Sequence, residues 1–291
     1  MFFVLAAFIF FPFLLLAWMF FEASRYQINP RFALVRKKLS RPLRILHLSD
    51  IHFRGKDRGL ELFFEKLGKE ACDFVFITGD IFDCAKGASQ AGLFKKLKPR
   101  YGTYAVFGNH DYYNYGLFDM AIHYSPGQGK PHRPQPAGIF EKALEHAGVR
   151  LLRNETVEVK VDGVPVLIHG LDDPITGRAN VRQAMLNFKP AKLNILLTHS
   201  IDVFLDIGEN EIDLSFSGHS HGGQVCLPGI GPILTHTLLG RQYAEGVKIL
   251  KGAACSISRG IGTSRFYRIR LLCRPEAILL EVTSSFPGKS G

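Results

Sequence analysis

Short apolar runs alternate with amphipathic segments from about residue 43 to residue 282 of the 291-residue chain. Runs of about four to eight apolar residues are typical of buried strands, whereas apolar residues at helical spacing indicate one face of a helix. Their alternation along the chain is typical of an α/β domain. The predicted strands are residues 43–48, 74–78, 104–107, 157–161, 166–169, 193–198, 212–217 and 277–282.

Three segments have apolar residues at helical spacing, namely residues 60–67, 140–147 and 181–188. Gly68 and Gly148 directly follow the first two of them, and glycine is favoured just beyond a helix C-terminus. We interpret the apolar stripes as core-facing surfaces without a cofactor role.

The N-terminal residues 1–21 have a different pattern, because they contain no charged side chain and are apolar except for Pro12. About 20 apolar residues match a bilayer core of about 30 Å, and a spanning helix tolerates proline. A cleaved signal peptide has a basic start and a shorter apolar run. Residues 1–21 are therefore predicted to be an uncleaved transmembrane anchor.

Basic side chains follow this segment and contribute to a net charge of +10. Glu22 is the single acid among them. Since cytoplasmic flanks are rich in Lys and Arg, we expect a single-pass protein of the inner (cytoplasmic) membrane with the body of the protein facing the cytoplasm. The cluster is also expected to lie against anionic headgroups. It consists of Arg25, Arg31, Arg36, Lys37, Lys38, Arg41 and Arg44.

The five cysteines are scattered and form no CxxC pair. This pattern indicates neither a disulfide framework nor a thiolate metal site, and it agrees with a reducing compartment. They are Cys72, Cys84, Cys226, Cys255 and Cys273.

The chain is thus predicted to have four parts. These are the anchor 1–21, a basic juxtamembrane linker 22–42, a catalytic domain 43–283 and a flexible tail 284–291. Within the domain, residues 120–136 are rich in Pro, Gly and basic side chains and are predicted to be a long loop. Two interpretations of this loop stay open: a surface insertion, or a basic lip over the substrate site.

Polar fragments follow several of the predicted strands, and their side chains are carboxylates and imidazoles. If the strands lie side by side, these metal-ligand types meet at one place and form a two-metal hydrolytic centre. The fragments are Asp50-Ile51-His52, Gly79-Asp80, Gly108-Asn109-His110-Asp111, Thr198-His199 and Gly218-His219-Ser220-His221.

The remaining histidines are treated separately. His47 and His169 lie within strand runs and are assigned to the core, and no role is assigned to His146 or His236. The loop residues His123 and His132 stay undecided.

The order of these fragments resembles the calcineurin-like metallophosphoesterase superfamily, whose pattern is DxH, GD, GNHD or GNHE, a lone His, and GHxH. The resemblance covers residues 43–282, and the segments 170–173, 219–224 and 258–262 are similar to a bacterial membrane-anchored branch. It implies a four-layer α/β/β/α sandwich of two mixed sheets, here preceded by one N-terminal transmembrane helix.

The resemblance also implies roles for the matching residues and two divalent metal ions. His110 would protonate the leaving group, Asp111 would orient His110, and Asn109 and Arg54 would contact the substrate. Manganese suits the mixed ligand set, and zinc, iron and magnesium are alternatives. The implied ligands are Asp50, His52, Asp80 and His221 for the first ion, and Asp80, Asn109, His199 and His219 for the second.

The residue pattern and the resemblance leave three functional classes to compare. The first is hydrolysis of a phosphoester or pyrophosphate bond in a small-molecule or lipid-linked nucleotide substrate, as in the UDP-2,3-diacylglucosamine pyrophosphatases of lipid A biosynthesis. The second is a membrane-tethered phosphodiesterase or protein phosphatase of broad specificity. A non-catalytic scaffold is disfavoured because every ligand position is filled. No nucleic-acid partner is expected, because no basic groove with interleaved aromatic residues is present.

Overall fold

The computed structural model describes residues 2–116, 133–190, 192–209, 211–263 and 268–284, with side chains from Phe10 onward. The predicted tail therefore lies outside the described part except for Ser284. Residues 120–132 of the predicted long loop, including His123 and His132, also lie outside it.

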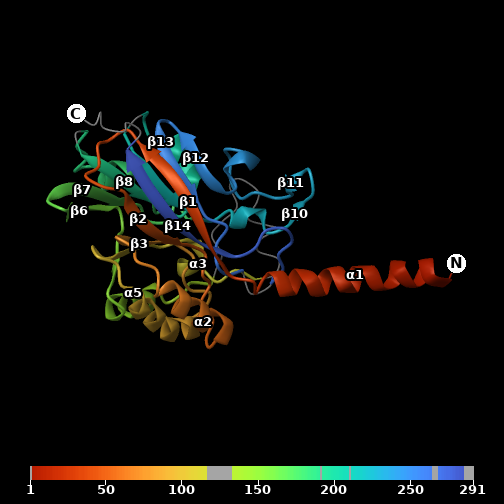
Figure 1. Cartoon of the computed structure of the whole chain (residues 1–291). Helices are drawn as coiled ribbons and strands as arrows, with labels where there is room; N and C mark the ends of the chain where they lie inside the picture. The colour runs from red at the N-terminus through yellow and green to blue at the C-terminus, as the bar shows by residue number, and fades with distance from the viewer. Residues whose placement is uncertain (1, 117–132, 191, 210, 264–267, 285–291) are drawn as a thin grey trace.

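Two mixed sheets of six strands each are stacked face to face (Figure 1). The first sheet has the order β1 (Gln27–Val35), β14 (Glu276–Ser284), β2 (Leu43–Leu48), β3 (Phe74–Thr78), β4 (Thr103–Val106) and β5 (Val149–Leu151). The second has the order β12 (Gly246–Leu250), β13 (Ala253–Ile257), β9 (Leu214–Ser217), β8 (Leu193–Leu197), β7 (Val164–Gly170) and β6 (Glu155–Val161). A hairpin of β10 (Cys226–Leu227) and β11 (Gly231–Pro232) lies beside them.

Parallel pairing dominates the centre of both sheets. Strands β2 to β5 run parallel in the first sheet, and β7, β8, β9 and β13 run parallel in the second. The carboxyl ends of parallel neighbours lie at the same sheet edge, so the loops that follow these strands are brought together.

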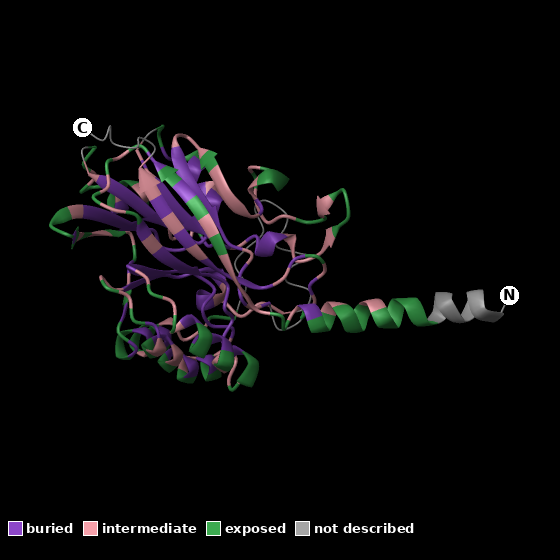
Figure 2. Ribbon diagram, viewed as in Figure 1, coloured by how far each residue is buried: buried purple, intermediate pink, exposed green. Residues whose placement is uncertain are grey.

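Helical segments cover the outer faces and complete the layers. The first sheet is covered by α2 (Arg58–Leu67), η1 (Ala85–Lys96) and α5 (Ala137–His146), and the second by α6 (Val181–Ala184) and η2 (Ile201–Leu205). Side chains such as Ile45, Phe76, Val106, Ile195 and Phe216 form a separate core between the sheets. Figure 2 shows buried strands inside and exposed helix faces outside.

The predicted pattern agrees with most of these elements. Every predicted strand is present with ends shifted by a few residues, and α2 and α5 match the first two predicted helices. The third is wrong in length, because only Val181–Ala184 of the segment 181–188 is helical. The strands β1, β5, β10, β11, β12 and β13 were not predicted.

The N-terminal helix α1 (Phe2–Glu22) projects from the body of the molecule (Figure 1). Its described side chains are mostly exposed. No helix in the described part of the chain combines the length and the apolar character needed to cross a membrane. The membrane-spanning segment thus remains a prediction.

The base of α1 is held by the loop before β14. The carbonyl of Met19 accepts a hydrogen bond from Arg270 N at 3.1 Å. The buried carboxylate of Glu22 accepts one from Cys273 N at 2.8 Å and one from Trp18 Nε1 at 3.1 Å. Glu22, counted in the sequence as a flanking charge, is therefore a structural contact.

The predicted linker 22–42 is partly wrong, because Gln27–Val35 forms a strand of the first sheet. This strand, β1, pairs in parallel with β14 along its whole length, from Gln27 opposite Glu276 to Val35 opposite Ser284. Ala33 and Val35 enter the core between the sheets. The folded domain therefore begins before Leu43.

The basic cluster is divided by the same strand. Nine extended residues span about 30 Å, so Arg36 and the residues after it lie at the end of β1 that is remote from α1. Arg41 there forms ion pairs with Asp73 at 2.6 Å and Asp162 at 2.8 Å. The seven basic residues therefore do not lie together at the base of α1.

Candidate metal centre

The loops after five parallel strands carry the predicted ligands and meet at one edge of the two sheets. Asp50 and His52 follow β2, Asp80 follows β3, and His199 follows β8. The remaining residues are His219 and His221 after β9, and Asn109, His110 and Asp111 in α3 (Asn109–Tyr112), which follows β4.

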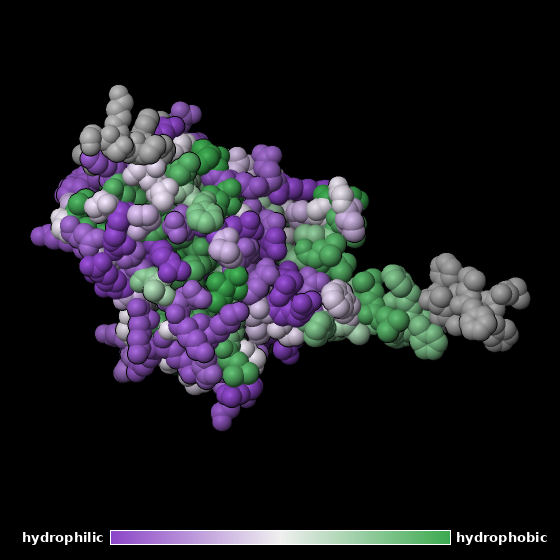
Figure 3. Space-filling model, in the orientation of Figure 1, coloured by the Kyte–Doolittle hydropathy of each residue, from purple (hydrophilic) through white to green (hydrophobic). Residues whose placement is uncertain are grey.

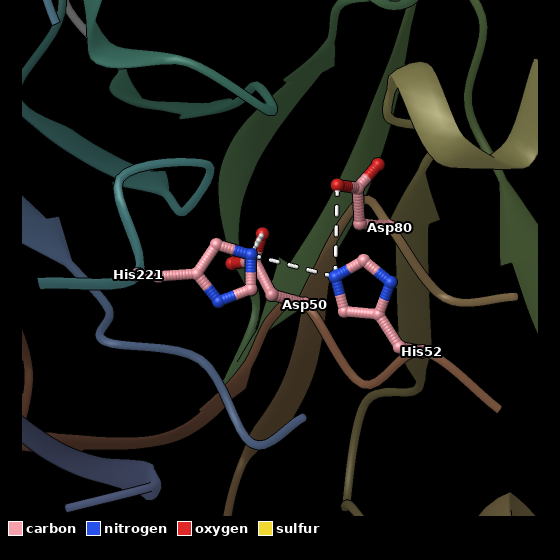
Figure 4. A group of neighbouring side chains, drawn as sticks. All are labelled: Asp50, His52, Asp80 and His221. Atoms are coloured by element: carbon pink, nitrogen blue, oxygen red, sulfur yellow. Dashed lines mark hydrogen bonds and ion pairs between the residues drawn. The ribbon is translucent and has the colours of Figure 1, made fainter. Parts of the chain in front are cut away.

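The first group consists of Asp50, His52, Asp80 and His221, whose possible ligand atoms all lie within 4.8 Å of one another. Figure 4 shows their polar ends facing one another. The Nε2 atoms of His52 and His221 are 3.4 Å apart. His221 Nε2 is 3.5 Å from Asp50 Oδ1, and His52 Nε2 is 3.9 Å from Asp80 Oδ2.

The second group consists of Asp80, His199 and His219 and shares Asp80 with the first. His199 Nε2 lies 3.4 Å from Asp80 Oδ2 and 3.2 Å from His219 Nδ1. His199 Nδ1 lies 2.8 Å from the carbonyl of Thr78, which fixes the ring so that Nε2 faces the group. One carboxylate thus connects two adjacent clusters of nitrogen and oxygen atoms.

Unpartnered polar atoms indicate that these groups fit metal ions. The side-chain oxygen of Asn109 is buried and has no hydrogen-bond partner in the described part of the chain. The close imidazole nitrogens cannot all satisfy one another, because a neutral imidazole offers one donor and one acceptor. A divalent cation would use these lone pairs and balance the carboxylates. Assignment of each residue to one ion stays a prediction.

The backbone at the site is held in the left-handed region at several of the predicted ligands. This conformation is uncommon for residues other than glycine and is concentrated at functional sites. It lets each loop turn sharply and point its side chain into the cluster. The φ angles are 49° at Asp50, 54° at His52, 50° at Asp80, 67° at His219 and 50° at His221.

Gly108 is required by close approach at the centre of the site. A Cβ atom there would lie 2.6 Å from Asp80 N and 2.8 Å from His199 Cδ2. These contacts are shorter than real Cβ atoms show. The glycine therefore lets the loop after β4 pack directly against two predicted ligands.

Burial and charge perturb the acid–base properties of the two groups. Burial opposes protonation of His199, but the carboxylates of Asp80 and Asp50 outweigh it and raise its pKa to about 10. Burial, together with the charge on His199, lowers the pKa of His219 to about 3. The site thus combines negative charge that requires a cation with a neutral imidazole that can bind one.

His110 lies at the edge of the first group, and its carboxylate partner is Asp83. Its Nδ1 is 3.4 Å from Asp83 Oδ1, which also lies 3.5 Å from His52 Nδ1. Arg54 Nε donates to the other oxygen of Asp83 at 2.9 Å. The sequence pattern did not single out Asp83, although it lies only three residues after Asp80.

Asp111 has other partners than the predicted one. Its carboxylate accepts hydrogen bonds from Ile81 N at 3.0 Å, Phe82 N at 2.8 Å and Gly108 N at 2.9 Å. Burial and the charge of Asp80 raise its pKa to about 7. The geometry favours Asp83 over Asp111 as the residue that orients His110, while Asp111 holds two site loops together.

Two other histidines were assigned to the core from the sequence, and His236 was given no role. His47 is buried, with its ring nitrogens 3.2 Å from Ser256 Oγ and 2.9 Å from Thr78 Oγ1, as expected for a core residue. His169 likewise contacts Thr156 and Asn194. His236 differs from the expectation, because its ring lies 5.6 Å from that of His219. No sequence signal indicated this neighbour, because residues 228–240 show no regular pattern.

Comparisons with known proteins agree with this geometry. The sequence model of the family "Calcineurin-like phosphoesterase" matches residues 43–223. The chain is 30% identical over 252 residues to the uncharacterized metallophosphoesterase YkoQ of Bacillus subtilis, covering 85% of this chain and 84% of that protein. The chain therefore belongs to the calcineurin-like phosphoesterase family. It is a metal-dependent phosphoesterase.

Two other relatives have more specific names. UDP-2,3-diacylglucosamine pyrophosphatase LpxG of Chlamydia muridarum is 26% identical over 279 residues, covering 82% of this chain and 83% of that protein. Phosphodiesterase YaeI of Escherichia coli is 24% identical over 263 residues, covering 86% of this chain and 88% of that protein.

Proposed function

We propose that this protein uses a pair of divalent ions to hydrolyse a phosphodiester or pyrophosphate bond in a lipid-linked substrate at a membrane face. The observation that carries the proposal is the pair of ligand clusters joined by Asp80. Divalent ions at these positions would supply Lewis-acid stabilisation of the charge that develops on phosphoryl oxygens. Manganese is our preferred ion, because its ligand preferences match the mixed nitrogen and oxygen set.

The protein supplies the proton transfer and part of the substrate orientation. His110 is 13% exposed at its side chain and lies beside Asp83, so it can reach a bound ester from the edge of the cluster. We propose that it protonates the leaving oxygen while Asp83 fixes its ring. Asn109 and Arg54 are proposed to contact the phosphoryl group, because Asn109 directly precedes His110 and Arg54 donates to Asp83.

The lipid-linked nucleotide is proposed from the relative named as a UDP-2,3-diacylglucosamine pyrophosphatase. Its sequence match extends over most of both chains. The substrate would then be split into a nucleoside monophosphate and an acylated sugar phosphate.

A membrane location is proposed from two exposed apolar surfaces. One is the described part of α1, where Phe10, Phe13 and Phe20 are exposed, and the other is the hairpin region with Leu234 and Leu238. Figure 3 shows apolar surface on α1 and on the adjoining part of the body. We propose that both face a bilayer from the cytoplasmic side. Flotation with phospholipid vesicles tests this, and a protein that stays in the vesicle-free fraction would contradict it.

The second candidate is a phosphodiesterase of broad specificity, favoured by the relative that carries this name. The same ligand clusters serve both functions, so kinetics must separate them. We expect manganese-loaded protein to have a higher kcat/KM for UDP-2,3-diacylglucosamine than for bis-para-nitrophenyl phosphate or a phosphopeptide. Preference for either soluble compound would refute the lipid-linked substrate and leave the phosphoesterase class intact.

A further inference from the structure

A cavity of about 690 Å³ lies between the loop after β2 and the base of α1. It is lined by His52 from that loop, and by Phe20 and Ala23 from the end of α1 and the turn after it. The same space therefore reaches from a loop that carries predicted ligands to the exposed apolar helix.

Two residues that line this cavity, Arg54 and Gln90, carry buried donors without a partner in the described part of the chain. Gln90 is 7% exposed, and its Oε1 accepts hydrogen bonds from Arg54 N at 3.0 Å and Gly55 N at 2.8 Å. These bonds fix the amide, yet its Nε2 has no hydrogen-bond partner among the described residues. Arg54 Nη2 is also buried and unpartnered in the described part. Because unpaired buried donors are costly, they indicate a ligand with anionic oxygens.

The carboxylate of Asp83 links these donors to the proposed chemistry. It accepts from Arg54 Nε at 2.9 Å and lies 3.5 Å from His52 Nδ1 and 3.4 Å from His110 Nδ1. Arg54 therefore lies next to the edge of the metal centre. Arg268 and Lys56 also line the cavity and add positive charge.

Part of the cavity lining is apolar and suits hydrocarbon. It includes Phe20, Leu60 and Ile261, together with Tyr26, whose ring is stacked on that of Phe63 with the centroids 5.3 Å apart. Phe20 remains 51% exposed at the end of α1. A chain leaving the cavity on this side would continue along the apolar surface of α1 (Figure 3).

We propose that this cavity binds the hydrocarbon arm of an amphiphilic phosphodiester, with Arg54 Nη2 and Gln90 Nε2 donating to the anionic oxygens of its head group. The inference rests on the proposed function and adds the residues that select a lipid-like substrate. A purely soluble phosphoester would use the two donors and leave the apolar part of the cavity empty.

Two chromogenic diesters that differ only in one alcohol test the hydrocarbon part. These are para-nitrophenyl hexadecyl phosphate and para-nitrophenyl ethyl phosphate, assayed with manganese and the full-length protein in micelles of a neutral detergent. Both release para-nitrophenol, so the same bond breaks. We expect the wild type to have the higher kcat/KM for the hexadecyl ester, and equal values would overturn the proposal.

The variant Gly59→Phe fills the apolar part of the cavity. Gly59 lines it, and an added Cβ would meet only ordinary contacts, 3.4 Å from Asp57 Oδ1 and 3.5 Å from Tyr26 Cε2. Each excluded methylene should lower affinity about fourfold, so the hexadecyl-to-ethyl ratio should fall about tenfold or more. The matched control is Gly92→Phe, whose side chain enters open space. An unchanged ratio in Gly59→Phe would overturn the proposal.

The variant Gln90→Glu tests the donor while keeping the oxygen that accepts from Arg54 N and Gly55 N. We expect kcat/KM to fall about tenfold or more for both esters, because a hydrogen bond to an anion is replaced by repulsion. Lys95→Gln makes the same change of charge at an exposed position of η1 and should behave as wild type. If Gln90→Glu had wild-type kinetics, Gln90 Nε2 would not donate to the substrate, and this part of the proposal would be overturned.

Hydrolysis of the ethyl ester by the wild type separates the two proposals. If metal-loaded wild type hydrolyses neither ester nor any other phosphodiester, the proposed function fails. If it hydrolyses the ethyl ester but the ratio does not respond to Gly59→Phe, only the cavity assignment fails.

Discussion

Asp80 is the residue on which the two ligand clusters depend. Its carboxylate belongs to both groups, its Oδ1 accepts from His110 N at 2.8 Å, and its backbone φ of 50° is left-handed. A shared anionic ligand reduces the repulsion between two nearby cations. The pattern of the sequence identified this residue because its identity and its position after a strand are local properties.

Asp80→Ala should therefore lose metal from both clusters. We expect inductively coupled plasma mass spectrometry of the purified variant to detect far less divalent metal per chain than in the wild type. Asp57→Asn is a control, because Asp57 caps α2 through its side-chain oxygen and asparagine caps equally well. Full retention of one ion in Asp80→Ala would contradict its bridging role.

Asp83 and Asp111 can be distinguished by what their removal changes. Asp83→Asn should lower kcat by about 10- to 100-fold, as loss of a residue that orients a site side chain typically does. Its free energy of unfolding should change less than that of Asp111→Asn.

Asp111→Asn should mainly lower stability. Its carboxylate accepts hydrogen bonds from three backbone N–H groups. In the variant, the NH2 group of asparagine would face one of these N–H donors and could not accept its hydrogen bond. The expected loss in the free energy of unfolding is about 1–3 kcal/mol. Kinetics and urea unfolding on both variants provide the comparison. A larger loss of kcat in Asp111→Asn, with unchanged stability, would return the orienting role to Asp111.

At the scale of elements, α1 and β1 have roles that their composition does not indicate. The last turn of α1 is tied to the loop before β14 through Met19 and Glu22. That loop also carries the fully buried Arg270, whose Nη2 donates to the carbonyls of Arg259 at 2.8 Å and Gly262 at 2.7 Å. The base of α1 is thus connected to the segment that lines the cavity beside the metal centre.

Glu22→Ala should lower the stability of the domain. The backbone N–H of Cys273 would lose its acceptor in a buried place, which costs about 1–3 kcal/mol. Glu65→Ala is the control, because its pair with Lys96 at 3.2 Å is exposed and contributes about 0–1 kcal/mol. Thermal unfolding of the two variants in detergent measures the difference. Equal midpoints would show that the base of α1 is not part of the folded unit.

At the scale of the whole molecule, stacking of two sheets creates the site. Five strands from both sheets end at one edge, and predicted ligands that are close in space can be far apart in the chain, as with His52 and His221. The cluster joins the first sheet to the second, so bound ions would hold the two sheets together.

Chelation should therefore lower thermal stability as well as activity. An ion that binds only the folded state adds about 2.7 kcal/mol to the free energy of unfolding when its free concentration is about 100 times its Kd. We expect the unfolding midpoint to fall after treatment with EDTA and to recover on addition of manganese. An unchanged midpoint would mean that the clusters bind metal too weakly to couple the sheets.

The amino-acid sequence by itself determined the α/β class, most strand positions and which residues are the predicted ligands. These follow from local properties, namely hydrophobic periodicity, glycine positions and the polar fragments after strands. Tertiary structure alone decided that β1 pairs with β14, that the carboxylate of Asp83 lies beside the ring of His110, and that His236 lies near His219. It also decided that the basic residues after β1 lie away from α1 and that Gln90 lines a cavity beside His52. Such contacts join segments remote along the chain, and no local pattern of side chains encodes which remote segments will meet.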